Sequence, residues 1–191
     1  MRMKKKPSNS DGNLDEVLSI ADAVGTDKIT LSSVAAEFLK TVKDPILAGG
    51  FAVAFHGFVR GTVDVDSIGI ATISAHIAAF KKLGYKSETI KLDIGTLYLL
   101  TKGETEKGID FIDLDNHEYK KSVIVRAVSG VFMGSPVKFV SLEDLIILKM
   151  LAKIGRKSKK DEIDLEFLLK KPHDKKYVSK WVKKLGGERG I

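Results

Sequence analysis

The stretch "GGFAVAFHGFVRGTVDVDSIGI", residues 49–70, decides the fold that we expect for this chain. It begins with Gly49 and Gly50, which follow a short apolar run, and it continues into a helix-like segment. Near its end, Asp64 and Asp66 alternate with valines. Successive side chains of a strand point to opposite faces, so the pattern predicts a strand with both carboxylates on one face and the valines in the core.

Paired carboxylates on one face favour a divalent metal. Two carboxylates this close raise each other's pKa unless a positive charge lies between them. Mg²⁺ prefers oxygen ligands and often takes one or two carboxylates together with substrate phosphates. A third carboxylate on a neighbouring strand would suit a two-metal centre. Asp110 and Asp113, in "GIDFIDLD" (108–115), are the candidates, and their spacing puts them on opposite faces. A solvated strand end is the simpler alternative.

The glycine pair indicates a phosphate site. A strand that runs into Gly49 and Gly50 and then into a helix presents backbone N–H groups with little steric cover. A plain turn is the alternative interpretation of such a pair. The order of glycine pair, helix and paired acids favours a site for a metal-bound nucleotide.

Hydrophobic periodicity predicts an α+β fold, in which helices flank a small mixed sheet and a helical part follows. Helices are expected at residues 13–24, 31–42, 51–59, 74–85, 141–155, 159–171 and 175–185. Strands are expected at residues 45–50, 62–70, 96–103, 108–115 and 136–141. We expect a flexible basic tail over 1–12, a core over 13–140, and a C-terminal helical region over 141–191 that packs on the core.

The composition is that of an ordinary globular protein, with 43% hydrophobic and 30% charged residues in 191. The net charge of +7 favours a polyanionic partner such as a nucleotide or an RNA, with a solvated surface as the alternative. The absence of cysteine excludes disulfides and zinc–thiolate sites and favours the cytoplasm. No apolar run approaches the roughly 20 residues of a membrane span, and the basic start lacks the apolar segment of a secretory signal.

The opening stretch resembles the signature of the nucleotidyltransferase superfamily, which has the polymerase-beta-like fold. That signature is an apolar residue, Gly, then Gly or Ser, a spacer, and Asp-apolar-Asp; the spacer here covers residues 51–63. More narrowly, the segment is similar to the branch of AbiEii-type toxins and their short relatives. Ser67 departs from that branch, which usually has an apolar residue there. The matching residues are Gly49, Gly50, Ala52, His56, Gly57, Arg60, Thr62, Asp64 and Asp66.

The resemblance continues in "SLEDLIILKMLAKIGRKSKKDEID" (141–164) and covers roughly residues 45–170 in all. It implies that Asp110, rather than Asp113, is the third carboxylate. It also implies a functional Lys149, which would contact nucleotide phosphates or offset charge during phosphoryl transfer. The matching residues of this segment are Leu142, Glu143, Asp144, Leu145, Lys149, Arg156, Lys160, Asp161 and Asp164.

Other roles remain open for several of these residues. The alternative for Lys149 is a lysine that extends its charge to solvent from an apolar helix, and Arg156 is a second candidate for nucleotide binding. Asp161 and Asp164 share a helix face. They would either orient Lys149 or contact the acceptor or base, or form surface pairs with neighbouring lysines.

Residues next to the acids also have two interpretations. Arg60 and Thr62 would contact the triphosphate, although Arg60 would as easily anchor its loop by pairing with a carboxylate. His56 is expected to be structural. Tyr177 and Trp181 lie four residues apart among lysines, and their helix is expected to dock its aromatic side on the core rather than to stack on RNA.

The sequence therefore predicts a metal-dependent nucleotidyltransferase that uses Mg²⁺ or Mn²⁺ and moves an NMP from an NTP to an acceptor hydroxyl. The metal ligands would be Asp64, Asp66 and Asp110. The resemblance implies a toxin–antitoxin or phage-defence setting, a tRNA or protein acceptor, a possible cognate antitoxin, and no membrane partner. The alternatives are a non-catalytic nucleotide- or RNA-binding module with the same fold, or an enzyme that modifies a protein.

Overall fold

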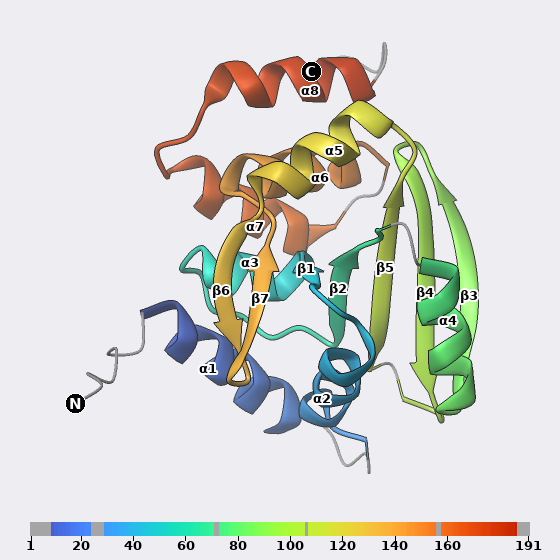
Figure 1. Cartoon of the computed structure of the whole chain (residues 1–191). Coiled ribbons are helices and arrows are strands. Elements are labelled where there is room, and N and C mark those ends of the chain that lie inside the picture. The colour runs from blue at the N-terminus through green and yellow to red at the C-terminus, as the bar shows by residue number, and fades with distance from the viewer. Residues whose placement is uncertain (1–8, 24–28, 71–72, 106, 156–157, 187–191) are drawn as a thin grey trace, which may run out of the picture.

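The computed structural model describes residues 9–23, 29–70, 73–105, 107–155 and 158–186. In this part of the chain, eight helices flank a seven-stranded mixed sheet (Figure 1), as the α+β prediction requires. The strand order in the sheet is β3-β4-β5-β2-β1-β7-β6. The strands are β1 (Ile46–Leu47), β2 (Asp64–Ile68), β3 (Tyr85–Leu92), β4 (Gly95–Lys102), β5 (Gly108–Leu114), β6 (Val128–Phe132) and β7 (Ser135–Phe139).

The helices lie on both faces of the sheet and at its end. The helices are α1 (Asn9–Ala23), α2 (Leu31–Thr41), α3 (Gly49–Phe55), α4 (Ile73–Lys82), α5 (His117–Arg126), α6 (Leu142–Gly155), α7 (Lys159–Leu169) and α8 (Lys175–Gly186). Helix α1 begins at Asn9, so residues 9–12, expected in the tail, form its first turn, and residues 1–8 lie outside the described part. No helix of the described ranges combines the length and apolar character that crossing a membrane requires.

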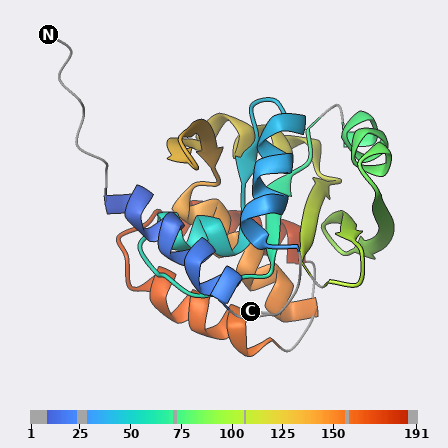
Figure 2. The ribbon, with the colours of Figure 1, turned by 90° about the horizontal axis from the view of Figure 1, so that it is seen from below.

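Each face of the sheet is covered by a different set of helices. Helices α2 and α4 cover one face, where Phe111 of β5 lies with its ring centroid 6.1 Å from that of Phe38 and 6.2 Å from that of Phe80. Helix α3 packs on β2 and α6 on the opposite face, and α6 in turn contacts α7 and α8. Viewed from below, α1 lies beside α3, and α4 lies at the far end of the molecule (Figure 2).

Strand pairing brings the two acidic segments together. Strand β2 pairs in parallel with β5, and the register sets Asp66 opposite Asp110. On its other side, β2 pairs antiparallel with the short β1, where Leu47 lies opposite Ser67. Strand β2 is therefore an interior strand, held on both sides at the position of the acids.

Three elements were not predicted from the sequence: β3, α5 and β6. Strands β3 and β6 are the two edges of the sheet and expose most of their residues, so they lack the hydrophobic alternation of a half-buried strand. Helix α5 buries only Tyr119 and Val123, and Asn116 caps its start by accepting a hydrogen bond from the Tyr119 N–H. Helix α3 begins at Gly49 and ends at Phe55, so it starts and stops earlier than the predicted 51–59.

Ser67 is buried on β2, and its hydroxyl donates a hydrogen bond to the Ile46 carbonyl at 3.1 Å. The polar residue that departs from the family pattern is thus satisfied by the neighbouring strand.

Candidate active site

Three carboxylates converge on the sheet face that α3 and α6 cover. One oxygen each from Asp64, Asp66 and Asp110 lies within 4.8 Å of the other two. Asp113, the alternative third acid, is engaged elsewhere, because its Oδ1 accepts a hydrogen bond from Lys120 Nζ at 2.5 Å. The structure therefore brings Asp110, and not Asp113, to the acidic pair.

Two small features of the chain make room for this cluster. A Cβ on Gly49 would lie 1.7 Å from Asp66 Oδ2, and a Cβ on Gly50 would lie 2.7 Å from Thr62 Oγ1. The glycine pair thus lets β2 and the residues before it lie against the start of α3. Thr62 is buried, and its hydroxyl donates a hydrogen bond to Asp64 Oδ1 at 2.9 Å, which orients that carboxylate.

A network of ion pairs borders the cluster. Asp164 of α7 is fully buried and accepts two hydrogen bonds from Arg60, from Nε at 2.6 Å and from Nη2 at 2.7 Å. Lys149 of α6 lies with its Nζ 2.7 Å from Asp161 Oδ1 and 2.8 Å from Asp164 Oδ2. Two cations and two anions therefore join the loop before β2 to α6 and α7.

This geometry decides between interpretations that the sequence left open. Arg60 anchors its loop to α7 through a carboxylate, and its Nη1 also donates to the Gly61 carbonyl at 2.8 Å. Lys149 does not extend to solvent, because its side chain is only 11% exposed. Asp161 and Asp164 are buried and orient Lys149, so they are not surface partners of neighbouring lysines.

The cluster carries a strong electrostatic conflict. Burial raises the pKa of Asp66 well above its usual range, and the charges of Asp64 and Asp110 raise it further. Lys149 and Arg60 oppose this effect. For Asp164, burial alone would raise the pKa, but the hydrogen bonds from Arg60 and Lys149 lower it below its usual value. Three carboxylates this close offer hard oxygen donors, a donor set that fits a divalent cation such as Mg²⁺.

A pocket of about 600 Å³ opens over the carboxylates. One part of it is polar and contains the acids, the glycine pair and the ion-pair network. The other part is largely apolar and lies between the turn that joins β3 to β4 and the second half of α6. The residues that line the apolar part are Leu92, Ile94, Leu97, Ile112, Leu148, Leu151 and Ala152.

Some residues at this pocket were not found from the sequence. Lys91 and Asp93 lie on the β3–β4 hairpin, and Ser158 lies at the start of α7, where Lys160, a residue that the sequence resemblance includes, also lines the pocket. The only available signal for the hairpin was the "LDIG" turn between two strands, and β3 itself was not predicted.

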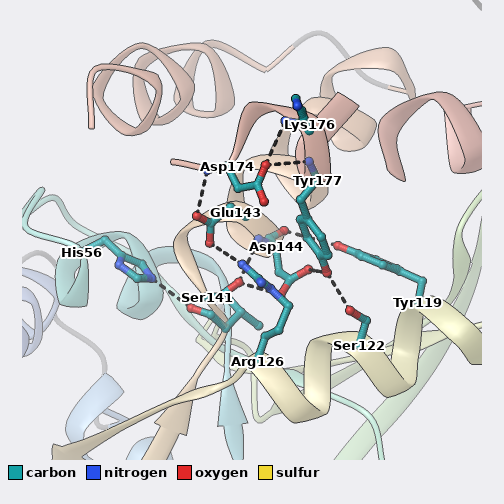
Figure 3. Close-up of polar contacts among 11 residues, drawn as sticks. His56, Tyr119, Ser122, Arg126, Ser141, Glu143, Asp144, Asp174, Lys176 and Tyr177 are labelled. Atoms are coloured by element: carbon teal, nitrogen blue, oxygen red, sulfur yellow. Dashed lines mark hydrogen bonds and ion pairs between the residues drawn. The ribbon is translucent and has the colours of Figure 1, made fainter. Parts of the chain in front are cut away.

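The remaining candidates lie apart from the acids or outside the described ranges. His56 is structural, because its Nε2–H donates to the Val140 carbonyl at 2.9 Å and burial lowers its pKa (Figure 3). Trp181 is 2% exposed and packs on Tyr119, so α8 docks its aromatic side on the core as expected. Arg156, predicted to bind nucleotide, lies outside the described residues.

Comparisons with known proteins identify the fold. No protein-family model matches the sequence, and no curated protein matches it significantly. Among solved structures, the lincosamide antibiotic adenylyltransferase LnuA, bound to lincomycin, is similar with a TM-score of 0.51 and 14% identity, over 73% of this chain and 94% of that one. The antibiotic-resistance factor ANT(2'')-Ia, determined in solution, is similar with a TM-score of 0.50 and 15% identity, over 81% and 84%. The chain therefore has the nucleotidyltransferase fold.

Proposed function

We propose that this protein is a metal-dependent nucleotidyltransferase that moves an NMP from an NTP to an acceptor hydroxyl. The observation that carries the proposal is the convergence of Asp64, Asp66 and Asp110 within 4.8 Å at a pocket of about 600 Å³. The fold supports it, since the structural neighbours include an adenylyltransferase. The intact acids favour catalysis over a binding module that has lost turnover.

In this proposal, Asp64, Asp66 and Asp110 hold one or two Mg²⁺ or Mn²⁺ ions. When bound, the metal neutralises phosphate charge and lowers the pKa of the attacking hydroxyl. Thr62 keeps Asp64 in its ligating orientation, and the Gly49 and Gly50 amides face the phosphates. Residues 49–50 thus have two roles. Their lack of side chains leaves room for the acids, and their backbone N–H groups donate hydrogen bonds to the phosphates.

The transfer exchanges the phosphoanhydride bond between the α- and β-phosphates for a phosphate ester bond to the acceptor. The acceptor oxygen attacks the α-phosphorus, the bond between the α-phosphorus and the bridging oxygen breaks, and pyrophosphate leaves with that electron pair. Asp110 accepts the proton of the acceptor hydroxyl. Lys149, fixed by Asp161 and Asp164, offsets the charge that develops on the phosphoryl oxygens. Arg60 acts indirectly by holding Asp164 in place.

The acceptor is the open part of this proposal. The sequence resemblance to AbiEii-type toxins supports a tRNA or protein acceptor and a toxin–antitoxin setting, and the absence of cysteine supports a cytoplasmic location. The name of the lincosamide adenylyltransferase instead points to a small hydroxylated compound for that protein. The net charge of +7 favours the polyanionic acceptor.

The test is a transfer assay with each of the four α-labelled NTPs and either Mg²⁺ or Mn²⁺. Total tRNA, a cell protein extract and lincomycin are supplied as separate acceptors. Asp64→Asn/Asp66→Asn removes two ligands and is expected to abolish labelling. Asp113→Asn is the matched control, because it is the same change on β5 with the side chain paired to Lys120 outside the cluster.

Label that appears with wild type and with Asp113→Asn, but not with the double variant, supports the proposed reaction, and the labelled acceptor names the substrate class. NTP binding without label on any acceptor would favour the non-catalytic module. Transfer that survives in the double variant would contradict the assignment of the acids.

A further inference from the structure

Helix α8 presents a row of lysines to solvent. Its sequence, KKYVSKWVKKLG, contains five lysines and no acidic residue. All five are exposed. Four of them follow one side of the helix at spacings of three and four residues, and the fifth, Lys175, is the first residue of the helix. We call this row the lysine face. Its members are Lys175, Lys176, Lys180, Lys183 and Lys184.

The opposite side of α8 is docked on the core and cannot move without breaking buried contacts. Val178, Trp181 and Val182 are at most 6% exposed. The Tyr177 hydroxyl donates to Asp144 Oδ1 of α6 at 2.7 Å and lies 2.9 Å from Ser122 Oγ of α5 (Figure 3). The orientation of the lysine face is therefore fixed by the core.

Neighbouring carboxylates neutralise little of this charge. The Asp174 side chain caps α8 by accepting hydrogen bonds from the N–H groups of its first residues. Glu143 accepts hydrogen bonds from Arg126 Nη2 and from the Asp174 N–H. Glu118 pairs with Lys184 alone. Among the described residues, then, one of the five lysines has a carboxylate partner.

The lysine face lowers the stability of the isolated helix. Lys176 and Lys180, and Lys180 and Lys184, are like charges four residues apart, and each such pair destabilises a helix by a few tenths of a kcal/mol. Two of the ammonium groups are held in place, since Lys180 Nζ and Lys184 Nζ each lie 5.1 Å from the centroid of the Trp181 ring. A row of cations on a fixed helix, four of which have no carboxylate partner among the described residues, is suited to a polyanion.

We infer that the lysine face binds the phosphodiester backbone of a nucleic acid, which is the acceptor of the transfer. The acceptor role of this nucleic acid rests on the proposed function. Nucleic-acid interfaces are strongly positive and gain most of their affinity from phosphate contacts. Protein interfaces are depleted of lysine and have an apolar centre, which this face lacks. The apolar side of α8 is buried against the core, so the helix has no exposed apolar side that could insert into a membrane.

The lysine face and the pocket share a supporting helix. Helix α6 contacts α8 and also carries Leu148 and Lys149, which line the pocket. Axes of packed helices lie about 8–10 Å apart. Helix α6 therefore links the helix that carries the lysine face to the wall of the pocket, and the fixed docking of α8 sets the path of a strand bound there.

The experiment measures binding of a fluorescent single-stranded RNA to the full chain, without NTP, across about 50–200 mM salt. The triple variant Lys176→Gln/Lys180→Gln/Lys183→Gln is expected to weaken binding at least tenfold and to reduce the slope of log K against log salt by about 2, since each phosphate contact contributes about 0.7. The matched control is Lys81→Gln/Lys82→Gln/Lys86→Gln, the same charge change on exposed lysines of α4 and β3, with less than a twofold effect expected.

Equal weakening by the two triple variants, or no weakening by the first, would overturn the inference. Loss of binding to phosphatidylserine vesicles rather than to RNA would also overturn it, in favour of a membrane surface. A DNA strand of the same sequence separates plain backbone binding from a need for ribose. If RNA binding depends on the lysine face but the protein transfers no nucleotide, the RNA-binding role of the lysine face is supported and only the proposed reaction is contradicted.

Discussion

Asp66 lies directly against Gly49, so that a Cβ on the glycine would meet Asp66 Oδ2 at 1.7 Å and Asp66 Cγ at 2.2 Å. Gly49 also has a φ of +50°, which disfavours any residue with a side chain. The first residue of α3 and the second acid of β2 are therefore matched in shape. Any side chain at position 49 must displace a carboxylate of the cluster.

Gly49→Ala is expected to lower the free energy of unfolding by about 2–4 kcal/mol, because backbone strain adds to overpacking. It is also expected to weaken Mg²⁺ binding, since Asp66 must move. Gly134→Ala is the matched control: Gly134 has a φ of +74°, but its added Cβ would meet no atom within 4 Å. Chemical denaturation and metal titration of the two variants separate strain from displacement. Equal metal affinity in both would contradict the shape match.

Asp66→Asn is expected to stabilise the metal-free protein. The raised pKa of Asp66 means that its ionisation costs the folded state free energy, a cost that grows as pH rises above the usual carboxyl pKa. At neutral pH and without divalent metal, Tm should rise by a few degrees. Excess Mg²⁺ should raise the Tm of wild type but not that of the variant. A lower Tm for metal-free Asp66→Asn than for wild type would contradict the claim that ionised Asp66 destabilises the metal-free fold.

Asp164→Asn is expected to destabilise the fold by about 3–5 kcal/mol, because it removes the buried carboxylate of Arg60 and leaves Lys149 with Asp161 alone. The lowered pKa of Asp164 gives stability that is complete above the usual carboxyl pKa and lost as pH falls through the lowered value. The variant should lose this acid dependence. Glu166→Gln, on the same helix with its side chain 73% exposed, should leave denaturation curves nearly unchanged at every pH.

His56 also loses its stabilising contribution as pH falls, but in a higher pH range than Asp164. Burial lowers its pKa, and Lys171 lowers it further, so the folded state holds the neutral ring. Its stabilising contribution is complete above the usual histidine pKa and is lost as pH falls below it, because the unfolded chain then binds the proton. His56→Gln should reduce the loss of Tm between pH 7 and pH 5. The exposed His117→Gln should follow the wild-type curve, and identical curves for both variants would exclude His56 as the cause.

Tyr177→Phe is expected to lower the free energy of unfolding by about 1–3 kcal/mol, because Asp144 loses a hydrogen-bond donor in a buried position. The ring and its contact with Arg126, whose Cζ lies 4.1 Å from the ring centroid, remain. Tyr98→Phe is the matched control, since its hydroxyl makes no hydrogen bond within the described ranges. Protease sensitivity of α8, measured for both variants, should increase only in the first.

The acidic pair could be predicted from the sequence because strand alternation is a local property. Asp64 and Asp66 must share a face wherever the strand lies. The choice between Asp110 and Asp113 was different, because each faces one side of the same strand and only the sheet decides which side is which. The parallel register that sets Asp66 opposite Asp110 supplies that decision, and only the family resemblance anticipated it.

The ion-pair network shows why the rest could not be predicted. Arg60 and Asp164 are separated by 104 residues, and no local pattern marks them as partners. The edge strands β3 and β6 and helix α5 were missed for a related reason. Most residues of β3 and β6 are exposed and α5 buries only two, so burial imposes little periodicity on the sequence that forms them.

The 104-residue separation of Arg60 and Asp164 also has a consequence for biosynthesis. At about 5–20 residues per second, a ribosome needs roughly 5–20 s to extend the chain from β2 to α7. For most of that interval, the nascent chain contains Asp64 and Asp66 without Lys149 of α6, and throughout it lacks Asp164 of α7, which holds Arg60 and Lys149 in place. A ribosome that stalls before α7 therefore leaves a product in which the acidic strand is present and the charged wall of its pocket is not.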